Sequence, residues 1–232
     1  MEQKEPKGFQ NYANVDGLIQ KEVRGEIDID KLLEAQREAK ITKEQFDRFL
    51  VRYARSLELD SLTGFFSKRA LEPTLKQILI ELGQSQEAEK RKLKLMALIV
   101  IYIDLNNFKT LNDECGHLEG DKELKTFAGR LKGSSRSYDL IFRNGGDEFV
   151  VLKPIYSHED ISEKALNGII KKTYYGVNSD LPVRLKKNGS KFKVTAAMGY
   201  IILHKGDSID PAEELIKRVE EKMYKDKGSN GR

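Results

Sequence analysis

Residues 142–152 read FRNGGDEFVVL and place two acidic residues directly after a glycine turn. Apolar residues flank the turn on both sides, so the stretch predicts two strands joined by the Asn-Gly-Gly turn. Asn and Gly both tolerate the positive φ that a tight hairpin turn uses. Asp147 and Glu148 follow at once, although adjacent carboxylates repel each other and neither residue favours a strand. The two acidic side chains therefore belong either to a functional site or to an ordinary turn exposed to solvent.

A continuous apolar run, Leu95 to Ile103, precedes the hairpin and ends in Asp104. Such a run predicts a central strand that is buried on both faces. The carboxyl end of a central strand is where α/β sheets usually bind ligands. If the hairpin pairs beside this strand, Asp104 lies with Asp147 and Glu148 at one edge, where Mg²⁺ would relieve the repulsion. This arrangement predicts a nucleotide triphosphate site of the kind found in polymerase palms. The alternative for Asp104 is an N-cap of the next helix.

Length and composition limit the classes of protein. The chain has 232 residues, which is room for one substantial domain with an extension. The apolar run of nine residues is far below the ~20 that a membrane helix needs. A net charge of +4 is too mild and dispersed to argue for nucleic acid. The single cysteine, Cys115, and the lack of a secretory signal predict a reducing, cytoplasmic location.

The pattern of the chain changes near residue 60. Residues 1–26 are a polar lead-in, and residues 28–59 show helical spacing in their apolar residues, which are Ile41, Phe46, Phe49, Leu50, Tyr53 and Leu57. We therefore expect an N-terminal segment over 1–59 and a domain over 60–232.

The domain shows a mixed pattern of helices and strands. Helices are expected near 67–83, after Phe108, and near 122–132, 159–173 and 211–226. Strands are expected at 95–104, in the hairpin, and as a pair within 191–203. This order predicts an α+β sandwich, with a central, mostly antiparallel sheet flanked by helices as in polymerase palms and nucleotide cyclases.

Five motifs in order carry a resemblance to a known family. RNGGDEF resembles the signature of the GGDEF family, the diguanylate cyclases. The other four are similar to further family motifs in the same order: DSLTGFFSKRAL at 60–71, DLNNFKTLNDECGHLEGD at 104–121, VTAAMGY at 194–200 and KMYKDKGSNGR at 222–232. The resemblance covers residues 60–232.

The resemblance implies an activity, a cofactor and partners. Two GTP would condense to cyclic di-GMP with release of two pyrophosphates, and two domains would face each other in a homodimer. Mg²⁺, or Mn²⁺ in its place, would be the metal. One alternative is an inactive module that binds GTP or cyclic di-GMP, although such domains usually lose the motif acids that this chain keeps. A second alternative is another nucleotide cyclase on the same fold.

The resemblance also implies roles at the metal. Asp104, the carbonyl of Leu105, and Asp147 would be the metal ligands. Asp147 is also the proposed activator of the 3′-hydroxyl, and Glu148 and Lys109 complete the implied catalytic set. Without the resemblance, the sequence predicts that Lys109 is a solvent-exposed lysine on a helix.

The resemblance also implies a group of residues that would bind the GTP substrate. Asn112 and Asp121 would read the guanine edge, with His117 between them, and Lys227 and Arg232 would hold the triphosphate. Asp121 accepting from guanine would repel the N1 lone pair of adenine, which argues for GTP. Asp121 also suits an N-cap of the helix that follows.

Two regulatory elements are expected. Arg136 and Asp139 match the family's inhibitory R-x-x-D site, where product would bind through guanine contacts. The alternative is a surface ion pair. Residues 28–59 would either tether two domains, which raises their effective concentration, or pack against their own domain.

Overall fold

The computed structural model describes residues 59–83, 94–157 and 159–230, of which 228–230 are described as helix backbone alone. The chain divides into two units between Leu59 and Asp60, and the description below concerns the second unit. The predicted helix over 28–59 lies outside the described residues, apart from Leu59.

A five-stranded sheet forms the centre of this unit, in the order β1-β3-β4-β2-β7. Its strands are β1 (Phe66–Ser67), β3 (Leu140–Arg143), β4 (Glu148–Tyr156), β2 (Leu95–Asn106) and β7 (Thr195–His204). Only β1 and β3 are parallel, and the other neighbours are antiparallel. The predicted hairpin is β3–β4, and β4 pairs with β2 as expected.

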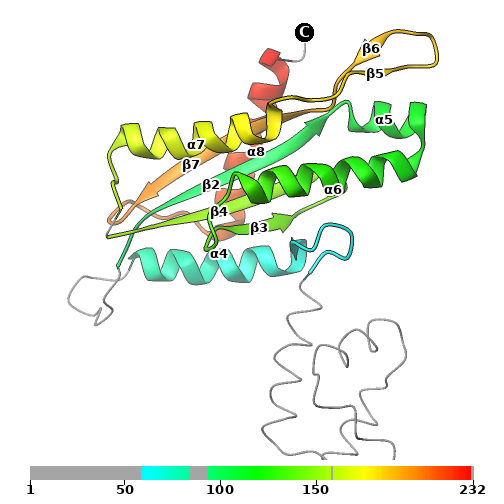
Figure 1. Cartoon of the computed structure of the whole chain (residues 1–232). Helices are drawn as coiled ribbons and strands as arrows, with labels where there is room; N and C mark the ends of the chain where they lie inside the picture. Colours follow the sequence, from blue (N-terminus) through cyan, green and yellow to red (C-terminus); the bar gives the residue numbers. More distant parts are fainter. Residues whose placement is uncertain (1–58, 84–93, 158, 231–232) are drawn as a thin grey trace, which may run out of the picture. The chain divides into compact units, whose positions relative to one another are not determined.

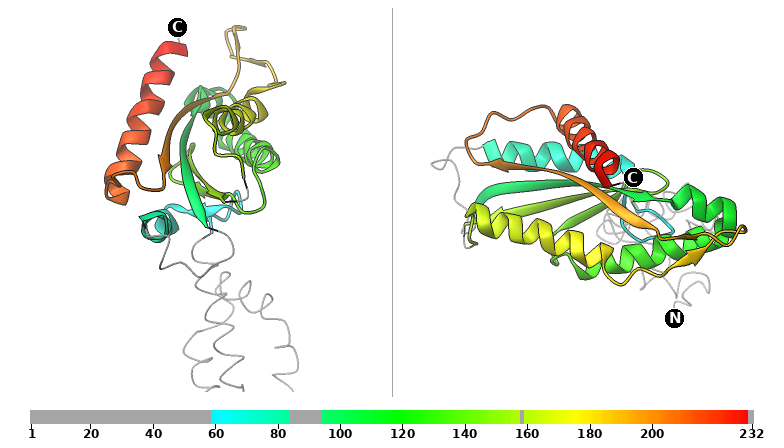
Figure 2. Two further views of the ribbon diagram at one scale, coloured as in Figure 1. Left: turned by 90° about the vertical axis from the view of Figure 1, so that its left-hand side faces the viewer. Right: turned by 90° about the horizontal axis from the view of Figure 1, so that it is seen from above.

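Helices cover both faces of the sheet (Figures 1 and 2). One face carries α5 (Phe108–Cys115), α6 (His117–Gly133) and α7 (Glu163–Asn178), and the other carries α4 (Lys68–Gly83) and α8 (Ala212–Asn230). The predicted α+β architecture, with a mostly antiparallel sheet flanked by helices, is confirmed.

The two hydrophobic cores follow from strand alternation. Ile99, Ile101 and Ile103 of β2 point to the core beneath α5, α6 and α7, whereas Val100 and Tyr102 point to the core beneath α4 and α8. Because β2 is covered on both faces, its sequence is apolar without a break. The alternation continues to the end of the strand and assigns the next even residue, Asp104, to the α8 face.

Some predicted elements differ from the structure. Helix α6 begins at His117 with Gly116 as its N-cap, so Asp121 lies inside the helix and does not cap it. The strand pair predicted within 191–203 is wrong. β6 (Lys191–Phe192) turns back onto β5 (Arg184–Leu185), while β7 pairs with β2. None of the described helices is long and apolar enough to cross a membrane.

Gly199 allows α8 to approach the sheet closely. A Cβ at this residue of β7 would lie 2.2 Å from the backbone nitrogen of Met223 and 2.5 Å from the carbonyl oxygen of Val219. Both are helix backbone atoms, so relief requires movement of α8 as a body. The close approach matters for the site because the same helix carries Lys227.

Gly199→Ala is therefore expected to destabilise the domain by roughly 1–3 kcal/mol, the usual cost of overpacking. Gly129→Ala is the matched control. Gly129 lies in α6, a Cβ there meets nothing within 4 Å, and the change should stabilise by about 0.5–1 kcal/mol. Urea unfolding of the two variants measures both effects. Equal midpoints for Gly199→Ala and the wild type would contradict the packing described.

Candidate active site

Acidic residues meet at the carboxyl end of β2. Asp104 of β2 and Glu148 of β4 are directly paired across the antiparallel ladder, so their side chains lie on the same face. Asp104 is 6% exposed. It precedes the end of its strand and does not cap α5, whose N-cap is Asn107. The pairing places the two carboxylates side by side at one end of these two central strands, next to Asp147. We call Asp104, Asp147 and Glu148 the acidic edge.

Lys227 supplies the nearest positive charge. Its Nζ lies 2.5 Å from Oδ1 of Asp104, and it comes from the last turns of α8. Asp226 beside it accepts a hydrogen bond from the backbone nitrogen of Met198, which fastens the end of α8 to β7. The helix therefore brings a lysine to the acidic edge from the α8 face of the sheet.

Asp147 is held where ionisation is unfavourable. Burial raises its pKa first, and the neighbouring carboxylates of Asp104 and Glu148 raise it further, while Lys227 acts in the opposite direction. A carboxylate in this position gains from a nearby cation more than an exposed one does. The site is therefore electrostatically suited to bind positive charge.

The ligand set fits a magnesium ion that shares its coordination with a substrate. Within the described part of the chain, no group of three or more His, Cys, Asp or Glu side chains could hold a metal. Mg²⁺ is usually held by one or two carboxylates together with substrate phosphates, and it prefers oxygen ligands. Asp104, Asp147 and the Leu105 carbonyl offer that kind of set.

Arg143 supports the turn that carries Asp147. Its Nε and Nη2 donate to the Gly146 carbonyl at 3.2 and 2.6 Å, and its Nη1 donates to both carboxylate oxygens of Asp60 at 3.1 Å. Asp60 also accepts from the backbone and hydroxyl of Thr63. Burial alone would raise the pKa of Asp60, but the hydrogen bonds from Thr63 and Arg143 lower it overall. The first motif of the domain thus supports the β3–β4 hairpin.

A second support comes from Tyr102, two residues before Asp104. Its hydroxyl accepts a hydrogen bond from Nδ2 of Asn144 at 2.8 Å. Burial raises the pKa of Tyr102, and the nearby Glu148 carboxylate raises it further, so the phenol stays protonated. Asn144 begins the turn and Glu148 ends it, so the Tyr102 hydroxyl interacts with both ends of the turn.

Of the two turn glycines only Gly145 has a close neighbour among the described residues, and the predicted positive φ is wrong. None of the turn residues 144–147 has a positive φ. A Cβ on Gly145 would lie 2.6 Å from Oε2 of Glu148. Glycine at this position therefore makes room for the acid of the following strand, and the close approach explains the residue type.

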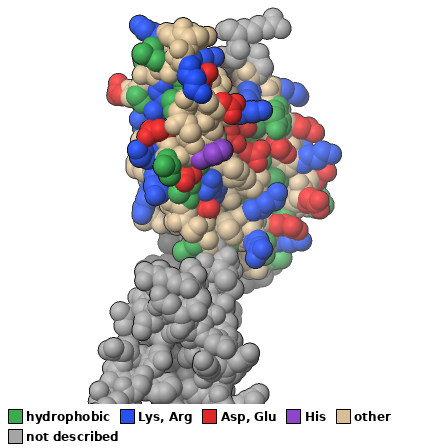
Figure 3. Space-filling model, turned by 90° about the vertical axis from the view of Figure 1, so that its right-hand side faces the viewer, with side chains coloured by type: hydrophobic (Ala, Val, Ile, Leu, Met, Phe, Trp, Pro, Cys, Tyr) green, Lys and Arg blue, Asp and Glu red, His purple; other side chains and the backbone are tan. Residues whose placement is uncertain are grey.

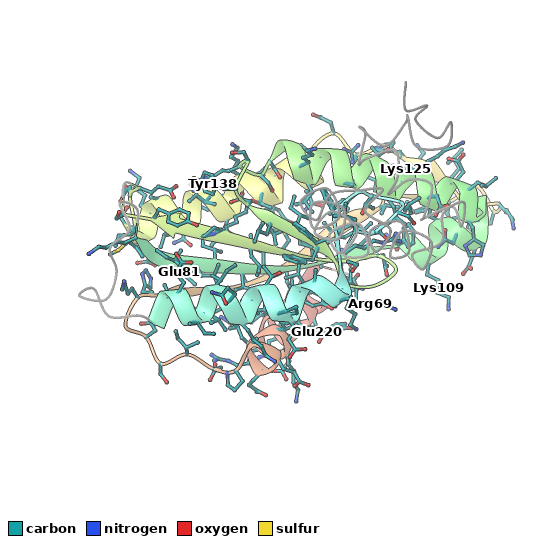
Figure 4. The ribbon with its side chains drawn as sticks, turned by 90° about the horizontal axis from the view of Figure 1, so that it is seen from below. Arg69, Glu81, Lys109, Lys125, Tyr138 and Glu220 are labelled. Carbon is teal, nitrogen blue, oxygen red and sulfur yellow. The ribbon has the colours of Figure 1, made fainter. Side chains whose placement is uncertain are left out.

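The packing of α5 on α6 places the Asn112 side chain against Gly120, the residue before Asp121. The two helices are joined at Gly116, whose φ is 85°. A Cβ on Gly120 would lie 2.0 Å from Oδ1 of Asn112, so glycine at this position leaves room for that amide against α6. Asp121, His117 and Lys109 are exposed, and Lys109 projects from α5 at the periphery of the domain (Figure 4).

The end of the domain that carries α5 and the β5–β6 hairpin has mixed charge. Acidic and basic side chains are interspersed over this face, with neither sign covering it alone (Figure 3). A mixed surface with local acidic and basic groups suits a small phosphate-bearing ligand better than an extended polyanion.

Comparison with known families gives an independent result. The profile described as diguanylate cyclase, GGDEF domain, matches residues 57–232. This chain belongs to the GGDEF family. The described GGDEF unit and the five sequence motifs fall within the matched range, as the resemblance predicted.

Relatives and solved structures agree with the family. The chain is 31% identical over 175 residues to the uncharacterized protein YhcK of Bacillus subtilis, covering 75% of this chain and 44% of that protein. It is 32% identical over 166 residues to the diguanylate cyclase TpbB of Pseudomonas aeruginosa, covering 71% and 34%. The chain thus spans less than half the length of these relatives. The coiled coil and GGDEF domain of DgcB from Caulobacter crescentus, solved with c-di-GMP, shares the fold with a TM-score of 0.61 and 19% identity, covering 87% of this chain and 94% of that one.

The predicted site residues of the GGDEF domain fall into three places. Asp104, Asp147, Glu148 and Lys227 gather at the acidic edge. The second group is Asn112, His117 and Asp121, at the α5–α6 junction. Arg136 and Asp139 lie before β3, and Arg232 lies outside the described residues. The supporting roles of Asp60, Tyr102 and Arg143 were not predicted, although Asp60 and Arg143 lie within two of the five family motifs.

Asp147→Asn is expected to stabilise the protein when divalent metal is removed by EDTA. Because the folded-state pKa of Asp147 is raised, its ionised form costs stability above that pKa, and the amide removes the cost. The gain in melting temperature should be full at pH 7 and should disappear as the pH falls below the ordinary pKa of 3.8. Asp113→Asn, at an exposed position of α5, is the control. A lower melting temperature for Asp147→Asn at pH 7 would contradict the electrostatics described.

Proposed function

We propose that this chain is a diguanylate cyclase that joins two GTP molecules into cyclic di-GMP and releases two pyrophosphates. The observation that carries the proposal is the acidic edge, where the Asp104 carboxylate lies close enough to raise the pKa of Asp147 and pairs with Lys227. An inactive binding module would not need to maintain a carboxylate pair whose repulsion costs stability. The GGDEF family match supports the same reaction.

Each ring-closing step forms a bond from a 3′ oxygen to the α-phosphorus of the other GTP. The bond from that phosphorus to the bridging oxygen breaks, and pyrophosphate leaves with its electron pair. In this proposal Asp147 takes the proton of the attacking hydroxyl, and Lys227 and Lys109 stabilise phosphate charge. Mg²⁺, or Mn²⁺ in its place, would be held by Asp104, Asp147 and the Leu105 carbonyl, and when bound it supplies Lewis-acid activation of phosphate and hydroxyl.

Guanine would be read at the α5–α6 junction. Asp121 can accept from N1–H and the N2 amino group, and the neighbouring Asn112 amide adds a second polar contact, with His117 beside them. Arg232 would join Lys227 at the triphosphate. The exposure of Asp121 leaves its carboxylate accessible to a ligand.

The reaction implies a homodimer, because one domain with one GTP cannot close a two-nucleotide ring. The tether formed by residues 28–59 remains part of the proposal.

Product feedback at Arg136 and Asp139 is also part of the proposal, since a guanidinium and a carboxylate are complementary to the edges of guanine. A cytoplasmic enzyme with soluble nucleotide substrates fits the composition.

Asp104→Asn and Asp147→Asn should each lower the rate of cyclic di-GMP formation at least about 100-fold, the scale of losing one group that stabilises developing charge. Asp160→Asn, an exposed position before α7, should keep the wild-type rate. Chromatographic quantification of cyclic di-GMP from GTP and Mg²⁺ measures the effect. Wild-type rates in either of the first two variants would remove the metal assignment.

The wild type should consume GTP and leave ATP unchanged. Asp121→Ala should reduce the ratio of kcat/KM for GTP over ATP by about tenfold or more, because a good bidentate base contact discriminates on that scale. Competition assays with both nucleotides present give the ratio directly. Efficient synthesis of cyclic di-AMP by the wild type would refute the base-reading assignment.

A further inference from the structure

Lys153 is a lysine in the middle of a buried strand. It lies on β4, where residues 149–155 are all buried, and its side chain is 1% exposed. Lysine is almost never buried to this degree unless it is paired. Its Nζ lies 2.6 Å from Oδ2 of Asp139 and 3.4 Å from the hydroxyl of Ser135. The lysine therefore depends on Asp139 for its counter-charge.

Asp139, the acid of the R-x-x-D pair, is turned into the domain. Its side chain is 0% exposed. Oδ2 accepts both from Lys153 and from the backbone nitrogen of Arg136 at 2.8 Å. Oδ1 is buried and has no hydrogen-bond partner among the residues that the structure describes. The carboxylate is thus used inside the domain, and the predicted alternative of a surface ion pair between Arg136 and Asp139 is wrong.

Arg136 is also engaged, but at the surface. Its Nη1 pairs with Glu159 and lies 2.9 Å from the hydroxyl of Tyr138, and its side chain is 29% exposed. Glu159 is itself held by the backbone nitrogen of Tyr156 at 3.0 Å. Figure 4 places Tyr138 near the end of the sheet opposite to Lys109. Arg136 can exchange a surface partner for a ligand, whereas Asp139 would have to leave a buried cation.

The burial of Asp139, in contrast to the partly exposed Arg136, determines how well these two residues can bind guanine. A guanine base would need the guanidinium at O6 and N7 and an outward carboxylate at N1–H and N2. If Asp139 rotates outward, Lys153 stays behind without a counter-ion, and removing one partner of a buried ion pair is strongly unfavourable. Burial already lowers the pKa of Lys153, against the raising effect of Asp139. Product binding must therefore work against the ion pair.

We propose that Lys153 holds the Asp139 carboxylate inside the domain, so that this chain binds cyclic di-GMP weakly at its R-x-x-D pair and product feedback requires a high concentration of cyclic di-GMP. This inference rests on the proposed function for its biological meaning, but the ion pair and its effect on binding can be tested separately. The site and the acidic edge share β4, with Lys153 about 17 Å along the strand from Glu148. Substitution at Lys153 thus leaves the hairpin acids in place.

The test is isothermal titration of the full chain with cyclic di-GMP, without GTP or divalent metal. Lys153→Met removes the charge and keeps the length, and it should tighten binding at least about tenfold by releasing Asp139. Adding Asp139→Asn to Lys153→Met should abolish that gain. Lys153→Arg, which keeps a cation, should bind as weakly as the wild type.

Circular dichroism melts establish that each variant is folded. If Lys153→Met does not fold, Lys153→Gln, which keeps a polar donor without the charge, should still bind more tightly than the wild type. Equal affinity of wild type and the folded charge-removing variant would overturn the inference. So would a wild-type Kd below about 1 µM that depends on the carboxylate of Asp139. A wild type that makes no cyclic di-GMP, together with tighter binding by Lys153→Met, would reject the proposed function and leave the ion-pair inference intact.

Discussion

Repulsion between the carboxylates at the end of β2 and the start of β4 is the constraint on which the rest of this domain's structure depends. Asp104 and Glu148 are paired across the ladder, and Asp147 lies next to them with a raised pKa. The register that brings them together is fixed by the apolar residues on both faces of β2. A slip of one residue would turn every side chain of the strand to the opposite face. Core packing therefore sets the position of the charges.

The neighbouring features keep that arrangement in place. Arg143 ties the turn to Asp60, and Tyr102 ties its first residue from inside the sheet. Close packing of α8 at Gly199 brings Lys227 to Asp104. These contacts let the protein hold negative charges together, at a cost in stability that a bound cation and substrate phosphates would offset. Under the proposed function, Asp147 therefore lowers the stability of the metal-free domain while it serves the reaction.

Much of this could be predicted from the sequence, because the signals were local. The apolar run of β2 and the turn of the hairpin identified the central strands, and the strand-end acid indicated the candidate site. Lys153 could not be recognised, since a lysine within a strand gives no sign that its partner lies fourteen residues earlier in the chain. The pairing of β5 with β6 was missed because two-residue strands have no periodicity. The space that Gly120 provides for Asn112 of the preceding helix likewise depends on how the two helices pack.

The central claim is that the acidic edge performs phosphoryl transfer and does not merely bind nucleotide. The most direct measurement follows GTP, pyrophosphate and cyclic di-GMP together in one reaction of the full chain with Mg²⁺, by chromatography and mass spectrometry. The account predicts that two GTP disappear and two pyrophosphates appear for each cyclic di-GMP, and that EDTA stops all three changes. GTP that binds to the protein and stays intact would contradict the account.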